Sequence, residues 1–129
     1  MKKLILLSTF FLSSLTIQAS YNDFDCYVKN FTVLSEESKG DKQFIEANLK
    51  KRFIIGISEQ EVIVTSISDI FESSTKKFNI FYKNEFFGTI SARNARSDET
   101  IVINPTTGKA TISIQGGFYL NAWLLDCKK

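Results

Sequence analysis

The stretch RFIIGISEQEVIVTSI, residues 52–67, decides the fold class of this chain. Phe53, Ile55 and Ile57 alternate with side chains of the opposite face, which is the pattern of a β-strand with one buried side. The polar residues 58–61 make a turn, and the residues after them alternate again. The stretch is therefore expected to fold as an antiparallel hairpin.

The same alternation extends from this hairpin toward both ends of the chain. In the segment PTTG, Pro105 sets the first angle of a tight turn and Gly108 supplies a positive φ. No helix long enough to connect parallel strands is evident, so we expect an all-β antiparallel meander of eight or nine strands. Such a meander hides its edges as a small lipocalin-like barrel or as a sandwich, and the sequence leaves both open. The expected strands are residues 23–34, 52–58, 61–67, 77–83, 86–92, 100–104, 109–115 and 118–129.

Two segments depart from simple alternation. The first strand alternates through Cys26 and Val28 and resumes out of step at Phe31, so a bulge is expected near residues 29–30. Residues 44–51 fit a short strand and also a helical turn, because their apolar residues suit either spacing. We favour the strand and keep the helical turn as the alternative.

The first 19 residues have the three parts of a secretory signal peptide. Lys2 and Lys3 precede an uncharged stretch, and Ala19 follows as the expected last residue removed. The apolar stretch is shorter than the roughly 18 to 20 residues that cross a bilayer. We therefore expect a bacterial periplasmic or secreted protein whose mature chain, residues 20–129, is a single β domain without a transmembrane segment.

The two cysteines of an exported chain are expected to form a disulfide. Joining Cys26 to Cys127 closes a loop of about a hundred residues, which disfavours the unfolded state by about 4 to 5 kcal/mol in the chain-entropy model. First and last strands would then be fastened together.

Charge and composition exclude several function classes. Removing Lys2 and Lys3 from 16 basic residues leaves 14, against 14 acidic residues, so the mature chain is neutral and no nucleic-acid partner is expected. The chain has no histidine, which removes Ser-His-Asp and Cys-His catalysis and most zinc sites. We expect no enzyme, no cofactor and no metal. The pairs of neighbouring acids are interpreted as solvated residues, and a hydrolase that uses them is only a third hypothesis; these pairs are Asp23 and Asp25, Glu36 and Glu37, Glu59 and Glu61, and Asp98 and Glu99.

The chain has more apolar side chains than one half-buried sheet can cover. Those expected to face the core are Phe78, Ile80 and Tyr82 in one strand, and Tyr119, Trp123 and Leu125 in the last. Those expected to meet a covering layer, a ligand or a partner are Phe118, Leu120 and Leu124 in the last strand, together with Phe81 and the adjacent Phe86 and Phe87.

In outline the chain resembles the small periplasmic barrel proteins that include inhibitors of c-type lysozyme. The resemblance lies in Tyr21 and Cys26 near one end, Cys127 at the other and the strands between them. The Ser-Gly-rich inhibitory loop of that family is not found, and residues 91–99, SARNARSDE, are only a loose analogue. No inhibitory residue is carried over, and the chain is not assigned to that family.

The leading functional hypothesis is a periplasmic binding protein of inhibitor or immunity type that holds a protein partner in the cell envelope. Its expected contact residues are Arg93 and Arg96 in a polar loop and Phe118, Leu120 and Leu124 on the last strand. The alternative is a carrier of a small apolar ligand, since an eight-stranded barrel is just wide enough for one. Its expected lining residues are Tyr82 and Trp123, with Phe118.

Overall fold

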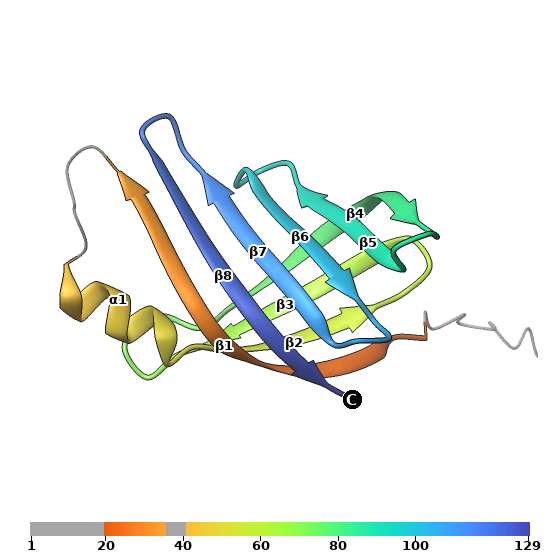
Figure 1. The fold of residues 1–129 in the computed structure, drawn as a ribbon, viewed down its shortest axis with the longest axis horizontal. Coiled ribbons are helices and arrows are strands. Elements are labelled where there is room, and N and C mark those ends of the chain that lie inside the picture. The colour runs from red at the N-terminus through yellow and green to blue at the C-terminus, as the bar shows by residue number, and fades with distance from the viewer. Residues whose placement is uncertain (1–19, 36–40) are drawn as a thin grey trace, which may run out of the picture.

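The computed structural model describes residues 20–35 and 41–129. The expected signal peptide and the acids Glu36 and Glu37 lie outside the described residues. In this part of the chain eight antiparallel strands form one closed barrel, in which each strand pairs with the next and the last pairs with the first (Figure 1). The elements are β1 (Asn22–Ser35), α1 (Lys42–Leu49), β2 (Arg52–Ile57), β3 (Glu61–Ile67), β4 (Ser74–Asn84), β5 (Thr89–Asn94), β6 (Glu99–Asn104), β7 (Lys109–Gln115) and β8 (Tyr119–Lys128).

The barrel closes between β1 and β8, which run side by side in Figure 1. Cys26 lies opposite Cys127 in this ladder, and the two form the expected disulfide. The register shifts between Val28 and Asn30, which confirms the bulge predicted near residues 29–30. Closure removes the free strand edges that an open sheet would expose.

The core fills the middle of the barrel. Alternate residues of the strands point inward and pack into one apolar cluster. The largest apolar side chains that are less than 2% exposed are Phe78, Ile55, Ile101, Ile103, Leu125 and Val62. The described barrel is therefore a packed core for most of its length, and two hollows open toward its ends.

The strand favoured for residues 44–51 is wrong, because residues 42–49 form the helix α1. Asp41 caps the helix, since its side chain accepts a hydrogen bond from the backbone N–H of Gln43 at 3.0 Å. Phe44 then packs edge-on against Phe31 and Phe71, with ring centroids 5.8 and 6.2 Å away. The cap and the aromatic contacts decide between two spacings that the sequence left open.

Two tyrosines expected to face the core do not. Tyr82 is 56% exposed, because the register between β4 and β5 shifts between Ile80 and Tyr82 and turns the following side chains over. Tyr119 is 46% exposed at the very start of β8, whereas Trp123 and Leu125 are buried as predicted.

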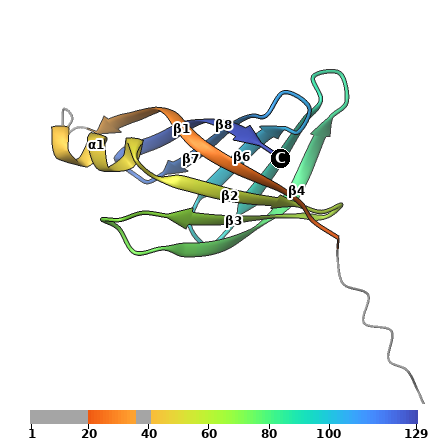
Figure 2. The same cartoon turned by 90° about the horizontal axis from the view of Figure 1, so that it is seen from below.

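The two ends of the barrel differ, as Figures 1 and 2 show. The helix end carries α1 and the turns at residues 68–73, 95–98 and 116–118. The termini end carries Ser20, Lys129 and the turns at residues 58–60, 85–88 and 105–108. No helix in the described residues is both long and apolar enough to cross a membrane.

Candidate functional site

An outer surface at the helix end brings several of the predicted contact residues together. Two shallow hollows of about 440 and 540 Å³ meet there, and both are lined by residues 115–117 of the turn that joins β7 to β8. We call this area the β7–β8 turn surface. Its further lining residues are Leu34, Ser35, Phe118, Tyr119 and Leu120 on one side, and Phe81, Arg93, Asp98, Thr100 and Ser113 on the other.

The turn itself explains why Phe118 projects. The backbone N–H of Gly116 donates to the carbonyl of Tyr119 at 3.0 Å and closes the turn. The Tyr119 ring occupies the space that a Cβ on Gly116 would need, so a larger residue there would displace this ring. Phe118, at the tip, is 82% exposed, an unusual position for so large an apolar side chain.

The polar part of this surface carries almost no net charge. Arg93 lies 3.5 Å from the carboxylate of Asp98, and the described lining contains no other charged side chain. Aromatic residues and arginine are enriched at protein interfaces, whereas lysine and acidic residues are depleted. The composition of the β7–β8 turn surface matches that preference.

The structure does not bring all five predicted contact residues to this surface. Arg93, Phe118 and Leu120 lie on it, whereas Leu124 lies farther along β8, opposite Thr111. Arg96 lines a separate hollow beside Lys76 and Lys77. Leu34 was missed, although the alternation of residues 31–34 placed it on the outer face.

A second group of exposed aromatic residues lies on the β4–β5 hairpin. Phe86 is 90% exposed at its tip and makes an edge contact with Phe87, with ring centroids 4.9 Å apart. The tip is at the termini end, away from the β7–β8 turn surface (Figure 1). The adjacent pair of phenylalanines in the sequence was the signal for it.

A small hollow of about 80 Å³ opens inside the barrel at the helix end. Lys76 and Glu99 point into it and form an ion pair, with Glu99 almost fully buried. The interpretation of Glu99 as a solvated residue is wrong, and Lys76 was not predicted as an inner residue, although the two share the inward parity of the core neighbours Ile101 and Phe78. The remaining lining residues are Lys51, Phe53, Val64, Ser66, Ser74, Phe78, Ile112, Ile114 and Trp123.

Lys51 is the third charged group of this inner hollow. Its amine lies 4.6 Å from the ring centroid of Phe71 and 5.0 Å from that of Trp123. Burial lowers the pKa of Lys51 below its ordinary 10.5, while the Glu99 charge raises it and the Lys76 charge lowers it further. The structure gives Lys51 no carboxylate within ion-pair distance among the described residues.

Trp123 lines the same hollow and is only 4% exposed. Its indole Nε1 is buried and has no hydrogen-bond partner among the described residues. A buried donor without an acceptor costs about 1–3 kcal/mol. Trp123 thus combines the lining position that the ligand-carrier hypothesis expected with an unused donor.

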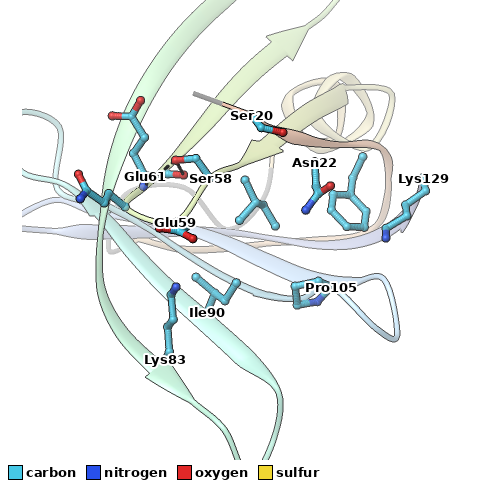
Figure 3. A pocket seen from close by; sticks show the side chains of 12 residues that line it. Ser20, Asn22, Ser58, Glu59, Glu61, Lys83, Ile90, Pro105 and Lys129 are labelled. Carbon is cyan, nitrogen blue, oxygen red and sulfur yellow. Dashed lines mark hydrogen bonds between the residues drawn. The ribbon is translucent and has the colours of Figure 1, made fainter. Parts of the chain in front are cut away.

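A hollow of about 850 Å³ forms an open depression at the termini end. Figure 3 shows Ser20 and Asn22 along one side of it and Lys83, Ile90 and Pro105 along the other. Its walls come from the strand ends and turns of this end of the barrel. It is a broad opening above the packed core and not an enclosed cavity.

The acid pair Glu59 and Glu61 lies at the edge of this depression, but Glu61 is already occupied. Its carboxylate accepts a hydrogen bond from the Tyr21 hydroxyl and lies 3.0 Å from the amine of Lys77. These two partners lower the pKa of Glu61. A carboxylate that two donors keep ionised is suited to linking Tyr21 to β3.

The other described acid pairs are also engaged in structural contacts. Asp25 accepts two hydrogen bonds from Arg52, at 2.9 and 2.7 Å, across the β1–β2 ladder. Asp98 pairs with Arg93 and Glu99 with Lys76, so these two neighbours serve opposite faces of the barrel wall.

Comparisons of the chain with protein-family models, with curated proteins and with solved structures found no match. The function is therefore inferred from the arrangement of the residues of this chain.

Proposed function

We propose that this chain is an exported, non-enzymatic binding protein that holds a protein partner over the β7–β8 turn surface. The observation that carries the proposal is the meeting of two shallow hollows at residues 115–117, flanked by the exposed Phe118 and by Arg93. Residues from six strands contribute, so the barrel wall presents the surface.

The chemistry of the surface favours a protein partner. Phe118, Leu34 and Leu120 supply apolar contact area, and burying it is favourable by about 25 cal/mol per Å². The Arg93–Asp98 pair and the hydroxyl and amide groups of the neighbouring strands supply hydrogen-bonding groups at the other edge. If the chain is of inhibitor or immunity type, its protein partner would present a complementary apolar knob with a polar rim.

The proposed location is the periplasm or the outside of the cell. The Cys26–Cys127 disulfide supports it, because such bonds persist in oxidising compartments. The tripartite composition of residues 1–19 supports export as well.

The test is capture from envelope extracts with three tagged proteins: the unchanged chain, the double variant Leu34→Ser/Phe118→Ser, and Phe86→Ser. We expect the unchanged chain to retain one partner in stoichiometric amount. The double variant should bind that partner about tenfold more weakly or worse, because it removes two apolar anchors. Titration of the purified pair gives the affinities.

Phe86→Ser is the matched control, since it removes an even more exposed phenylalanine from the opposite end of the barrel. It should bind as the unchanged chain does. Equal binding by all three proteins, or no stoichiometric partner at all, would contradict the proposal.

A second candidate function is that of a carrier of a small apolar ligand, and the observation that favours it is the inner hollow lined by Trp123. Tyr82 and Phe118, the other residues expected to line a ligand, are exposed and do not line this hollow. Native mass spectrometry of protein purified without denaturation should show an added small-molecule mass. A clean unliganded mass, with Trp123 fluorescence that does not respond to apolar probes, would exclude this candidate.

A further inference from the structure

We infer that the inner hollow at the helix end binds the carboxylate group of a singly charged anion, held by Lys51 and the indole N–H of Trp123. The inference is independent of the protein-partner proposal. It rests on the second candidate function and changes its ligand from a neutral apolar molecule to a carboxylate.

The charged residues of the hollow carry one more positive than negative charge. Three of its lining residues are charged, namely Lys51, Lys76 and Glu99, so two positive charges face one negative charge. Glu99 already forms an ion pair with Lys76. The aromatic rings beside Lys51 carry no negative charge, so they compensate its positive charge less than a carboxylate would. One more negative charge would balance the site.

The hollow also contains an unused donor. Trp123 Nε1 is buried and finds no acceptor in residues 20–35 and 41–129, while the Lys51 amine lies 5.0 Å from the centroid of the same ring. A carboxylate has two oxygens, so one can face an ammonium group while the other accepts from the indole. A halide offers one centre and a neutral amide offers no charge, so neither fits both groups.

The size of the hollow also suits a small carboxylate. The hollow of about 80 Å³ holds two or three groups the size of water, which occupies about 30 Å³ in the liquid. A carboxylate with one or two carbons fills that space. The apolar walls formed by Phe53, Val64, Phe78 and Ile112 suit the carbons and not a second charged group.

The carboxylate has two potential sources, a small organic acid contained in the hollow or the head group of a longer acyl chain that extends beyond it. Acetate represents the first and octanoate the second. Octanol is the neutral match of octanoate, and acetamide is that of acetate.

Trp123 is the only tryptophan of the chain, so its indole N–H gives a single reporter signal in a ¹H–¹⁵N spectrum. The experiment uses oxidised protein expressed from the full chain and titrated with each probe at constant ionic strength in chloride. We expect a saturable shift of the indole signal with acetate and octanoate and none with acetamide or added chloride. Equal affinities for the two acids identify a small organic acid, and octanoate binding about tenfold more tightly identifies an acyl chain.

Lys51→Met should weaken carboxylate binding about tenfold or more, because it removes the unpaired charge and keeps the length of the side chain. Lys50→Met is the matched control, since Lys50 is the exposed neighbour and lies outside the hollow. Glu99→Gln should strengthen binding several-fold, because Lys76 is then free to contact the anion as well.

Three results would overturn the inference: an indole signal that no carboxylate shifts, a shift that chloride reproduces, and unchanged affinity in Lys51→Met. Octanol binding as tightly as octanoate would also overturn it while leaving the apolar-carrier candidate standing. If neither the acids nor octanol bind, both fail.

Discussion

Lys51 is the residue whose surroundings differ most from those of an ordinary surface lysine. Its ammonium group rests on two aromatic rings at the barrel mouth, where water is partly excluded. Desolvation of a charge costs free energy unless an opposite charge compensates it, and the described residues place that compensation on Lys76. The partly buried charge of Lys51, which the proposed anion site requires, therefore lowers the free energy of unfolding.

This cost predicts that Lys51→Met raises the melting temperature at pH 7 by roughly 3 °C. The pKa of Lys51 is lowered in the folded state, so the unfolded chain binds more protons between that lowered pKa and 10.5. The penalty is complete below the folded pKa and disappears as the pH rises through this window. The lost contact with the two rings offsets part of the gain.

Thermal unfolding followed by circular dichroism from pH 7 to 10.5 measures the effect. The advantage of Lys51→Met over the unchanged chain should shrink as the pH rises, and Lys50→Met should show no advantage at any pH. A variant less stable than the unchanged chain at pH 7, or an advantage that grows with pH, would refute this reading of Lys51.

Among the elements, the turn between β6 and β7 follows most directly from the sequence. Gly108 has the positive φ that its place in the PTTG segment predicted, at 73°. Its N–H donates to the Asn104 carbonyl at 2.9 Å, and its own carbonyl accepts from the N–H of Cys127 at 2.7 Å. The turn therefore holds the end of β8 against the barrel, beside the disulfide.

Gly108→Ala is expected to lower the free energy of unfolding by about 2 kcal/mol. A Cβ at this position would be strained by the positive φ and would collide with the carbonyl oxygen of Cys127. Urea unfolding measures the loss. Gly117→Ala is the control, because a Cβ there meets nothing within 4 Å, and its stability should stay within about 0.5 kcal/mol of the unchanged chain.

The helix α1 shows where local sequence stops being sufficient. Ile45 and Leu49 fit a strand face and a helix face equally well, so periodicity could not decide. The decision came from the Asp41 cap and from Phe44, whose ring packs between Phe31 and Phe71 from distant parts of the chain. Contacts of this range are invisible to a reading of neighbouring residues.

The residues of the candidate sites were also predictable only in part from the sequence. Alternation placed Phe118 and Leu120 on the outer face. It would also have placed Lys76 and Glu99 on the inner face if the pattern had been applied to charged residues. It could not show that residues 115–117 join two hollows, because that depends on the register of six strands. It also failed at Tyr82, where one bulge after Ile80 reverses the facing of the strand.

At the scale of the whole molecule, the barrel depends on one ladder between segments a hundred residues apart. β1 and β8 are the paired strands farthest apart in the sequence, so bringing them together costs more chain entropy than forming any single hairpin. The Cys26–Cys127 bond, with a sequence separation of 101, brings the two segments together in the unfolded chain as well. It thus reduces the entropy lost when the barrel closes.

Reducing the disulfide is therefore expected to lower the free energy of unfolding by about 3 to 5 kcal/mol, out of a total near 5 to 15 kcal/mol for a small domain. In urea, where such domains lose roughly 1 to 3 kcal/mol per molar denaturant, the midpoint should fall by about 2 M. Unfolding curves with and without dithiothreitol measure this shift. The double variant Cys26→Ala/Cys127→Ala should match the reduced protein and should not respond to dithiothreitol. A midpoint that stays the same after complete reduction would mean that the β1–β8 hydrogen bonds and the core alone close the barrel, and that the bond between its first and last strands adds nothing to its stability.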